Sequence, residues 1–455
     1  MYSILRAIRE NPQILIESQR KRGESIEIVE KAIALDKKWR EAKKEIDCLR
    51  AERNKISREI SKKPEEKEKL LKKAKEISEK IKKKEEELKT IEQELNKTLL
   101  SIPNILHESV PIGKDESENV PIRFWGKARV YKEHEQDFIK QSLGKAEYEI
   151  IDFKPIPHAD AVELLGADLE RAAKTSGARF YFLLDDLVYL DFALTLYALD
   201  FLKKQGFTIV NPPYMIRRKP YEGVTALSDF EDVIYKIENE DLYLIATSEH
   251  AIAAMHMDEV LEERELPLLY AGISPCFRKE AGAHGKDTKG IFRVHQFNKV
   301  EQFVFCLPEE SWKWHEKLIE NAEKLFQGLG LPYRIVNICT GDIGVVAAKK
   351  YDLEVWMPAQ GKYREMVSCS NCTDWQSYRL NIRYAEERGK PSKGYVHTLN
   401  STAIATTRAI TAIIENFQQE DGSVIIPKVL RKYLEPIESA PKEVIKPINF
   451  KKFKK

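Results

Sequence analysis

The first hundred residues carry a hydrophobic pattern that predicts two long helices. Mostly apolar residues recur at alternating spacings of three and four between Ala32 and Ile60, and again between Leu70 and Leu95. Such spacing is the seam of a coiled coil. The two runs are separated by Ser61-Lys-Lys-Pro64, and proline disfavours helical geometry in the residue before it. We therefore predict an antiparallel helical hairpin, whose helices each reach on the order of 50 Å. The seam positions are Ala32, Leu35, Trp39, Ala42, Ile46, Leu49, Arg53, Ile56 and Ile60 in the first helix, and Leu70, Ala74, Ile77, Ile81, Lys84, Leu88, Ile91 and Leu95 in the second.

Beyond the hairpin the pattern changes to short apolar runs broken by proline and glycine. Residues 101–141 are interrupted by Pro103, Pro111, Gly113 and Pro121, as is typical of a linker that enters a new domain. We therefore predict two domains, residues 1–112 and residues 113–455. In the second domain the pattern predicts helices at 158–165 and 187–204.

Alternating side chains predict a pair of antiparallel strands within residues 276–303. Because strand side chains have period two, Phe297 and Glu301 share one face of the second strand. The first strand adds Arg278 and Glu280. Such a pair can hold a phosphate, a purine edge and an amine together, so we predict a nucleotide site here. The glycine-containing loop at 281–290 is expected to be mobile when the site is empty and to order around its ligands.

A second group of polar residues, Thr247, Ser248 and Glu249, ends an apolar run that predicts a strand at 242–249. Thr and Ser at such a position most often cap the following helix, by accepting hydrogen bonds from free backbone N–H groups. Glu249 adds a carboxylate that could hold a cationic amine. Both interpretations remain open at this point.

The segment from Glu365 to Cys372 offers ligands of two kinds. Glu365 and Ser368 supply the oxygen atoms that Mg²⁺ prefers around nucleotide phosphates. Cys369 and Cys372 form a Cys-x-x-Cys pair, but a structural zinc site needs four ligands and no second pair has suitable spacing. We therefore expect no zinc, and buried thiols at both positions.

Arg408 is the only cation in an apolar helical pattern that follows Asn400. A lone arginine on a helix is usually the partner of a surface ion pair. Among small alanine and threonine residues it could instead be the counter-charge of a phosphate.

Composition suits a soluble globular protein of two or three domains: 455 residues, of which 42% are hydrophobic and 33% charged. No signal-peptide pattern is visible at the start, and no apolar run approaches the ~20 residues of a membrane helix. Cysteine usage is typical of reduced thiols. We therefore expect a cytoplasmic protein with no membrane attachment.

The net charge of +2 conceals an asymmetry, since residues 1–100 contain 28 Lys and Arg but 21 Asp and Glu. A basic hairpin on a mildly acidic body suggests an acidic partner, with nucleic acid as the leading candidate. A structural spacer is the alternative interpretation of the hairpin alone.

Taken together, these segments resemble a known family. Phe277-Arg-Lys-Glu280 with Arg293-Val-His-Gln-Phe297 resembles motif 2 of class II aminoacyl-tRNA synthetases, and Asn400-Ser-Thr402 with Arg408 resembles motif 3. With the hairpin and residues 247–249 and 365–372, the likeness is to the seryl-tRNA synthetases, in their common form without zinc. It implies an α+β fold: an antiparallel-sheet class II catalytic domain flanked by helices, with an N-terminal antiparallel coiled-coil arm.

The resemblance also implies the chemistry. Serine and ATP would form seryl-adenylate and pyrophosphate, and the seryl group would pass to the 3′ end of tRNA(Ser); charging of tRNA(Sec) stays open. The arm would grip the tRNA, and the protein would be a homodimer. Catalytic residues would be Arg278 and Arg408, and Mg²⁺ would be held by Glu365 and Ser368. ATP would contact Arg278, Lys279, Glu280, Val294, Phe297, Glu365, Met366, Val367, Ser368 and Arg408. L-serine would contact Thr247, Ser248, Glu249, Arg278, Glu301 and Thr402.

One position departs from the family, which commonly shows Asn-Gly-Ser where this chain has Asn400-Ser401-Thr402. The hydroxyl survives, but the added methyl group and the lost glycine would tighten the pocket. Two rival functions remain: a class II relative that activates another small amino acid or charges a carrier protein, and a non-catalytic RNA-binding scaffold.

Overall fold

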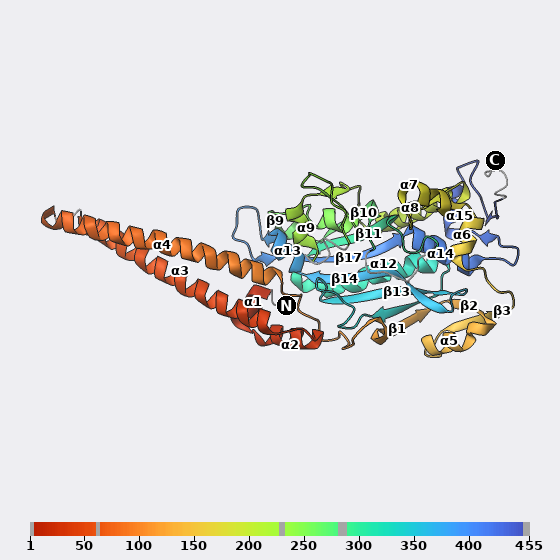
Figure 1. The fold of residues 1–455 in the computed structure, drawn as a ribbon, viewed down its shortest axis with the longest axis horizontal. Helices are drawn as coiled ribbons and strands as arrows, with labels where there is room; N and C mark the ends of the chain where they lie inside the picture. The colour runs from red at the N-terminus through yellow and green to blue at the C-terminus, as the bar shows by residue number, and fades with distance from the viewer. Residues whose placement is uncertain (1–3, 61–63, 227–232, 281–288, 449–455) are drawn as a thin grey trace. The chain divides into compact units, whose positions relative to one another are not determined.

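The computed structural model describes residues 4–60, 64–226, 233–280 and 289–448. The chain divides into two compact units, Met1–Ile105 and Leu106–Lys455 (Figure 1). Most of the loop predicted at 281–290, and the break at 61–63, lie outside the described residues. No helix within the described ranges is both long and apolar enough to cross a membrane.

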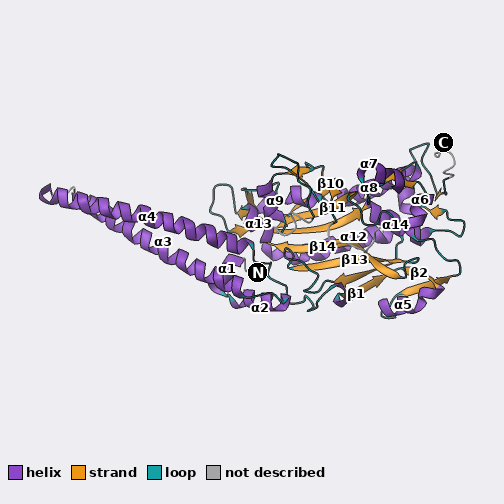
Figure 2. Cartoon of the chain, in the orientation of Figure 1, coloured by secondary structure: helices purple, strands orange, loops and turns teal. Residues whose placement is uncertain are grey.

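The first unit is helical, and its two longest helices form an antiparallel pair (Figure 2). Every predicted seam position of this pair is buried or half-buried, so the predicted coiled coil is confirmed. Ion pairs such as Lys31–Glu94 and Lys84–Glu45, both at 2.9 Å, cross from one helix to the other. The helices are α1 (Ile4–Glu10), α2 (Gln13–Arg22), α3 (Glu27–Ile60) and α4 (Lys67–Leu100).

The short helix α1 is fixed to α3 by a buried carboxylate. Asp36 is fully buried on α3 and accepts hydrogen bonds from Arg9 at 2.7 Å and from Arg40 at 2.8 Å. A buried carboxylate is tolerated because both of its oxygens have charged donors.

The second unit is built on an eight-stranded sheet that confirms the predicted antiparallel architecture. All neighbouring strands are antiparallel except β10 and β6, which are parallel. In spatial order the strands are β1 (Val120–Trp125), β12 (Tyr333–Asn337), β13 (Lys349–Met357), β14 (Lys362–Thr373), β17 (His397–Ala405), β11 (Gln296–Cys306), β10 (Leu268–Phe277) and β6 (Thr208–Val210).

Smaller elements surround this sheet. The other strands are β2 (Lys127–Tyr131), β3 (Glu147–Ile151), β4 (Ala167–Asp168), β5 (Phe182–Leu183), β7 (Met215–Ile216), β8 (Tyr243–Leu244), β9 (Val260–Glu262), β15 (Arg383–Ala385), β16 (Gly394–Tyr395), β18 (Val424–Ile425) and β19 (Val444–Ile445). The helices are α5 (Glu135–Gln141), α6 (His158–Leu164), α7 (Leu169–Ser176), α8 (Asp186–Lys204), α9 (Arg218–Val224), α11 (Ser248–Ala253), α12 (Ser311–Leu329), α13 (Trp375–Leu380), α14 (Thr406–Phe417) and α15 (Lys428–Leu434).

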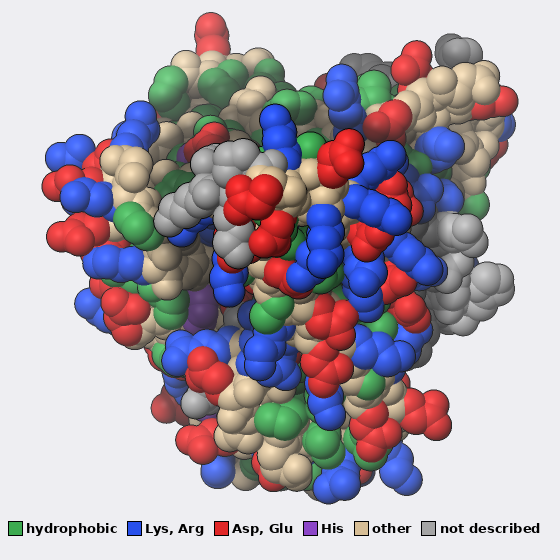
Figure 3. All heavy atoms as spheres, turned by 90° about the vertical axis from the view of Figure 1, so that its left-hand side faces the viewer, with side chains coloured by type: hydrophobic (Ala, Val, Ile, Leu, Met, Phe, Trp, Pro, Cys, Tyr) green, Lys and Arg blue, Asp and Glu red, His purple; other side chains and the backbone are tan. Residues whose placement is uncertain are grey.

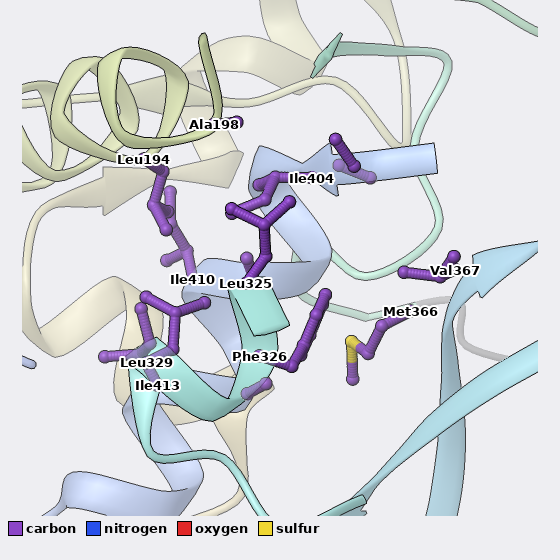
Figure 4. Close-up of a cluster of buried hydrophobic side chains, with 14 of the residues drawn as sticks. Leu194, Ala198, Leu325, Phe326, Leu329, Met366, Val367, Ile404, Ile410 and Ile413 are labelled. Atoms are coloured by element: carbon purple, nitrogen blue, oxygen red, sulfur yellow. The ribbon is translucent and has the colours of Figure 1, made fainter. Parts of the chain in front are cut away.

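The main core lies where α8, α12 and α14 pack against the sheet. Leu194 of α8, Phe326 of α12 and Ile410 of α14 meet Ile404 of β17 in this cluster (Figure 4). The cluster includes Met366 and Val367 of β14 and Ala403 of β17, so the core packs directly against the strand segments that carry several of the predicted site residues. Charged side chains of both signs are interspersed on the protein face drawn in Figure 3.

The strand predicted at 242–249 is shorter than expected. It is limited to Tyr243–Leu244, and helix α11 already begins at Ser248. The reason is local: the Thr247 hydroxyl accepts a hydrogen bond from the Glu249 backbone N–H at 3.2 Å and so caps the helix. The capping interpretation of Thr247 is therefore correct.

Candidate active site

A cavity of about 260 Å³ opens over the sheet and gathers most of the predicted site residues. They reach it from α11, from the β10–β11 pair, and from β14, β17 and α14. The walls are formed by Thr247, Glu249, Arg278, Phe297, Lys299, Glu301, Lys350, Glu365, Met366, Ser368, Asn400, Thr402, Ala405 and Arg408.

Arg278 and Phe297 meet where β10 and β11 pair. Cys276 lies opposite Phe297 in the register, so Arg278 follows directly beyond the last strand residues. The Arg278 guanidinium lies 5.3 Å from the centre of the Phe297 ring, within cation–π distance. Its Nε donates to the Ala246 carbonyl at 3.3 Å, and no other residue in the described ranges accepts from its terminal nitrogens, which can therefore contact a ligand.

Further along β11, Lys299 and Glu301 project into the same cavity. Both are buried, and the Lys299 Nζ lies 2.6 Å from the Glu301 carboxylate. Thr402 lies opposite Glu301 on β17, and its hydroxyl donates to the same carboxylate at 3.3 Å. Glu301 therefore presents a carboxylate whose position is held from two strands.

Glu249 stands at the start of α11 with two side-chain amides around it. Gln376 and Asn400 each donate to its Oε1 at 3.0 Å. Burial, together with the negative charge of Glu301, raises the pKa of Glu249 to about 7. The Glu249 carboxylate is thus close to its titration midpoint at neutral pH.

Arg408 and Glu365 occupy the other end of the cavity. The Arg408 guanidinium lies 3.2 Å from the Glu365 carboxylate and 5.1 Å from the Phe292 ring. Burial opposes ionisation of Glu365, but the positive charges of Arg408, Lys350 and Arg278 outweigh it and lower its pKa to about 2. Glu365 is therefore a carboxylate at every physiological pH.

Two further cavities adjoin this one. A cavity of about 570 Å³ shares Lys350, Glu365 and Arg408 with it, and Arg293, Arg334 and Arg364 add positive charge to its walls. Another, of about 360 Å³, shares Glu249, Lys350, Ser368 and Asn400. A ligand larger than an amino acid can therefore extend from the central cavity on either side.

Five predicted contacts do not line the central cavity. The Ser248 hydroxyl donates to the Gly272 carbonyl at 3.4 Å, facing β10. The Glu280 carboxylate accepts from Arg293 at 3.0 Å, and the Lys279 backbone N–H donates to the Val233 carbonyl. Val294 and Val367 are buried in the main core, and Val367 appears with Met366 in Figure 4.

Sequence reasoning left out Lys299, Lys350 and Asn400 as site residues. Lys299 shares the face of Phe297 and Glu301 by its period-two position, so that signal was present. No sequence pattern pointed to Lys350, because it lies on β13, and β13 is brought to the site only by its place beside β14 in the sheet. Asn400 was named only as the first residue of the segment that resembles motif 3, and no ligand contact was predicted for it.

The donor set at Glu365 suits magnesium better than zinc. The ionised Glu365 carboxylate and the Ser368 hydroxyl both face the central cavity, and oxygen donors are the ligands of Mg²⁺. Burial raises the pKa of the Cys369 and Cys372 thiols, which disfavours the thiolates that zinc requires. Within the described ranges, no three His, Cys, Asp or Glu side chains are grouped to hold a metal ion.

The charges on the cavity walls fall into a simple pattern. Lys299 pairs with Glu301, Arg408 with Glu365, and Lys350 lies 3.7 Å from Asp352. Among the described residues, the cavity's two other charged groups, Arg278 and Glu249, have no ion-pair partner. The cavity thus offers a ligand one cation, Arg278, and one anion, the ionised form of Glu249.

An antiparallel sheet that brings motif 2 and motif 3 arginines to one cavity defines a class II aminoacyl-tRNA synthetase. Residues 232–417 accordingly match the family model of the tRNA synthetase class II core domain (G, H, P, S and T). Residues 5–106 match the seryl-tRNA synthetase N-terminal domain. The chain belongs to the seryl-tRNA synthetase family.

Individual relatives agree over the whole chain. It is 76% identical, over 98% of its own length and 99% of the relative's, to a protein of Archaeoglobus fulgidus named Serine--tRNA ligase. A crystal structure of seryl-tRNA synthetase from Pyrococcus horikoshii complexed with ATP is similar with a TM-score of 0.93 and 58% identity, covering 99% of this chain and 100% of that one. A crystal structure of the cytoplasmic serine-tRNA ligase of Naegleria fowleri in complex with AMP is similar with a TM-score of 0.83 and 41% identity, covering 96% of each chain.

Proposed function

We propose that this protein is a cytoplasmic ligase that activates L-serine with ATP and transfers the seryl group to tRNA(Ser). The observation that carries the amino-acid half of this proposal is the pairing of charges in the central cavity. A zwitterionic amino acid brings one carboxylate and one ammonium group. Arg278 and Glu249 are the groups left to receive them, and the other charges already have partners.

In this proposal, serine lies between Arg278 and the two buried glutamates. Its carboxylate would meet the Arg278 guanidinium, and its ammonium group would meet Glu249 and the Thr247 end of α11. Glu301 and Thr402, joined by a hydrogen bond, would face the hydroxyl group. Alanine would leave these buried polar groups without a partner, which is the physical basis of rejection.

ATP would extend from the central cavity toward Arg408. The adenine ring would stack on Phe297 and lie under Arg408, and Arg278 would contact the α-phosphate. Glu365 and Ser368 would hold Mg²⁺, which when bound would shield the phosphate charges. The neighbouring cavity with Arg293 and Arg364 has room and positive charge for the outer phosphates.

The reaction then needs no side-chain nucleophile. An oxygen of the serine carboxylate attacks the α-phosphorus, the bond to pyrophosphate breaks, and Arg278 stabilises the charge that develops. In the second step a hydroxyl of the terminal tRNA ribose attacks the seryl carbonyl and AMP leaves. The residues contribute position and electrostatic stabilisation.

Amino-acid-dependent ATP–pyrophosphate exchange tests the function directly. We expect strong exchange with serine and little with alanine, glycine or threonine. Strong exchange with one of the other three would favour a relative of different specificity. Absence of exchange with all four would favour a non-catalytic scaffold.

The Glu249 carboxylate gives a prediction about pH. Because burial and Glu301 raise its pKa to about 7, the carboxylate is ionised above that pH and protonated below it. The KM for serine should therefore rise as pH falls from 8 to 6, while the KM for ATP stays nearly constant. Glu249→Gln should raise the serine KM by roughly 10²-fold at pH 8 and flatten its pH dependence.

Glu262→Gln is the matched control for Glu249→Gln. Glu262 is also buried, but it pairs with Arg264 away from the cavity walls. Its substitution should leave the serine KM and its pH dependence unchanged. An unchanged serine KM in Glu249→Gln would remove Glu249 from the amino-acid site.

The homodimer is proposed on the edge of the sheet at β6 and the neighbouring helix α8. Phe192 and Leu196 lie one turn apart on α8 and are 58% and 48% exposed, and Ile209 on β6 is 44% exposed. Within the described ranges β6 is the last strand of the sheet, and exposed apolar side chains next to such an edge are typical of an interface. This segment, a long helix followed by Gly206 and a short strand that ends at Pro212-Pro213, also resembles motif 1 of class II aminoacyl-tRNA synthetases.

Replacing Phe192 and Leu196 together by aspartate should therefore yield monomers. Charges in the middle of an apolar interface should weaken dimerisation by roughly 10²-fold or more, which sedimentation velocity would measure. Leu143→Asp is the matched control, because Leu143 is similarly exposed at 55% but lies after α5. A dimer that survives the double substitution would place the interface elsewhere.

A further inference from the structure

The most informative group outside the cavity is a buried amide that touches Glu249. Gln376 is completely buried on helix α13 and does not line the central cavity. Its Nε2 nonetheless donates to the Glu249 Oε1 at 3.0 Å. The amide therefore acts on the cavity only through this carboxylate.

The orientation of the Gln376 amide is fixed from both ends. Its Oε1 accepts a hydrogen bond from the Thr398 hydroxyl at 2.7 Å, and its Nε2 donates to the Val224 carbonyl at 3.1 Å. A reversed amide would set its oxygen against the Val224 carbonyl and the ionised form of the Glu249 carboxylate, neither of which can donate. The N–H group must therefore face Glu249.

Asn400 completes the arrangement from β17. Its Nδ2 donates to the same Glu249 Oε1 at 3.0 Å, so two amide donors converge on one oxygen. Among the described residues, the other oxygen, Oε2, accepts no hydrogen bond, and Glu249 lines the central cavity. One oxygen is thus held by the protein and the other remains for a cationic ligand.

We propose that Gln376, held by Thr398, is a positioning residue that sets the orientation and ionisation of the Glu249 carboxylate, and through it the affinity for the amino group of serine. This rests on the proposed function, because it requires that Glu249 bind the ammonium group. Gln376 itself would touch neither serine nor ATP.

The charged surroundings of Glu249 explain why the amide matters. Burial and Glu301 on β11 favour the protonated acid, whereas Lys299 on β11 and Arg278 after β10 favour the carboxylate. Lys350 of β13 shares the cavity, and His250 on α11 stays neutral because burial lowers its pKa to about 3. Cys372 of β14 is a neutral thiol, since burial raises its pKa. Because these influences oppose one another, each N–H group that donates to the carboxylate favours the ionised form of Glu249 over the protonated acid.

The test is the pH profile of the serine KM in ATP–pyrophosphate exchange, for Gln376→Leu against the wild type. Loss of a donor to the carboxylate should raise the pKa of Glu249 by about one unit. The serine KM should then rise about fivefold at pH 7. At pH 9 it should rise less than about twofold, because Glu249 is ionised in both the wild type and the variant at that pH. The KM for ATP and the rate at saturating serine should stay within about twofold of the wild type.

Thr398→Val is the milder second variant, because it removes only the hydroxyl that orients the amide. It should shift the profile in the same direction, with about a twofold rise in serine KM at pH 7. Ser377→Ala is the control: Ser377 is equally buried on α13, but its hydroxyl donates to the Asp374 and Val396 carbonyls. It should leave the profile in place.

Distinct results separate the possible failures. An unshifted profile in a folded Gln376→Leu or Thr398→Val protein would overturn the proposal. Equal increases of both KM values at every pH, with a lowered melting temperature, would also overturn it by showing a purely structural role. If the wild type gave no serine-dependent exchange, the proposed function would fail instead.

Discussion

Arg278→Ala should abolish adenylate formation, lowering kcat/KM in serine-dependent ATP–pyrophosphate exchange by roughly 10³-fold. Arg278 is the cavity's one cation without an ion-pair partner among the described residues, and it stands between the proposed positions of the serine carboxylate and the α-phosphate. Its loss removes both substrate orientation and stabilisation of the negative charge that develops on the phosphorus. Arg278→Lys should recover only part of the activity, since an ammonium group lacks the five donors in a fixed plane with which a guanidinium orients two anions.

The matched control for Arg278→Ala is Arg388→Ala. Arg388 is 79% exposed and approaches Glu262 and Glu265 at the protein surface, so its removal should leave exchange unchanged. Melting temperatures measured for all three variants would exclude unfolding as the cause of a loss. Normal exchange by Arg278→Ala would remove Arg278 from the mechanism.

Shortening the coiled-coil arm should separate the two steps of the reaction. Replacing residues 47–81 by a four-residue Gly/Ser turn cuts the arm just outside the Glu45–Lys84 ion pair and leaves the inner seam intact. We expect serine-dependent exchange within about twofold of wild type, because the catalytic unit has its own core. Aminoacylation of tRNA(Ser) should fall by roughly 10²-fold or more through lost phosphate contacts.

Charge substitutions on α4 provide a sharper version of the same test. Lys72, Lys75 and Lys82 are exposed, and changing all three to Gln should raise the KM for tRNA and flatten its dependence on salt. Changing the equally exposed Glu76, Glu79 and Glu86 to Gln on the same helix should not raise it. If the shortened arm left aminoacylation unchanged, or if both triple variants behaved alike, the arm would be a spacer.

The coiled coil was predictable from sequence because its cause is local. Each seam residue faces the partner helix through a spacing of three or four along its own chain, and all of these positions are buried or half-buried. The β10–β11 pair was predictable for the same reason, since period two places Phe297 and Glu301 on one face. Both patterns can be recognised within a single segment of sequence, without knowing which other segments pack against it.

Contacts that depend on distant segments were beyond such reasoning. Lys350 reaches the cavity because β13 lies beside β14, and Gln376 reaches Glu249 from a helix 127 positions along the chain. Ser248 shows the opposite problem: its place in the motif suggested a ligand contact, but the early start of α11 turns it toward β10. The residue at which the helix begins therefore decides which side chain enters the site.

The ion pairs of the central cavity also bear on the speed of the chemical step. Lys299 with Glu301, and Arg408 with Glu365, are held in place by the fold before any substrate arrives. Water, by contrast, must reorient its dipoles whenever charge moves during a reaction. Because these fixed pairs need no such reorientation, most of the electrostatic reorganisation is completed once, when the chain folds, and is not repeated at each turnover.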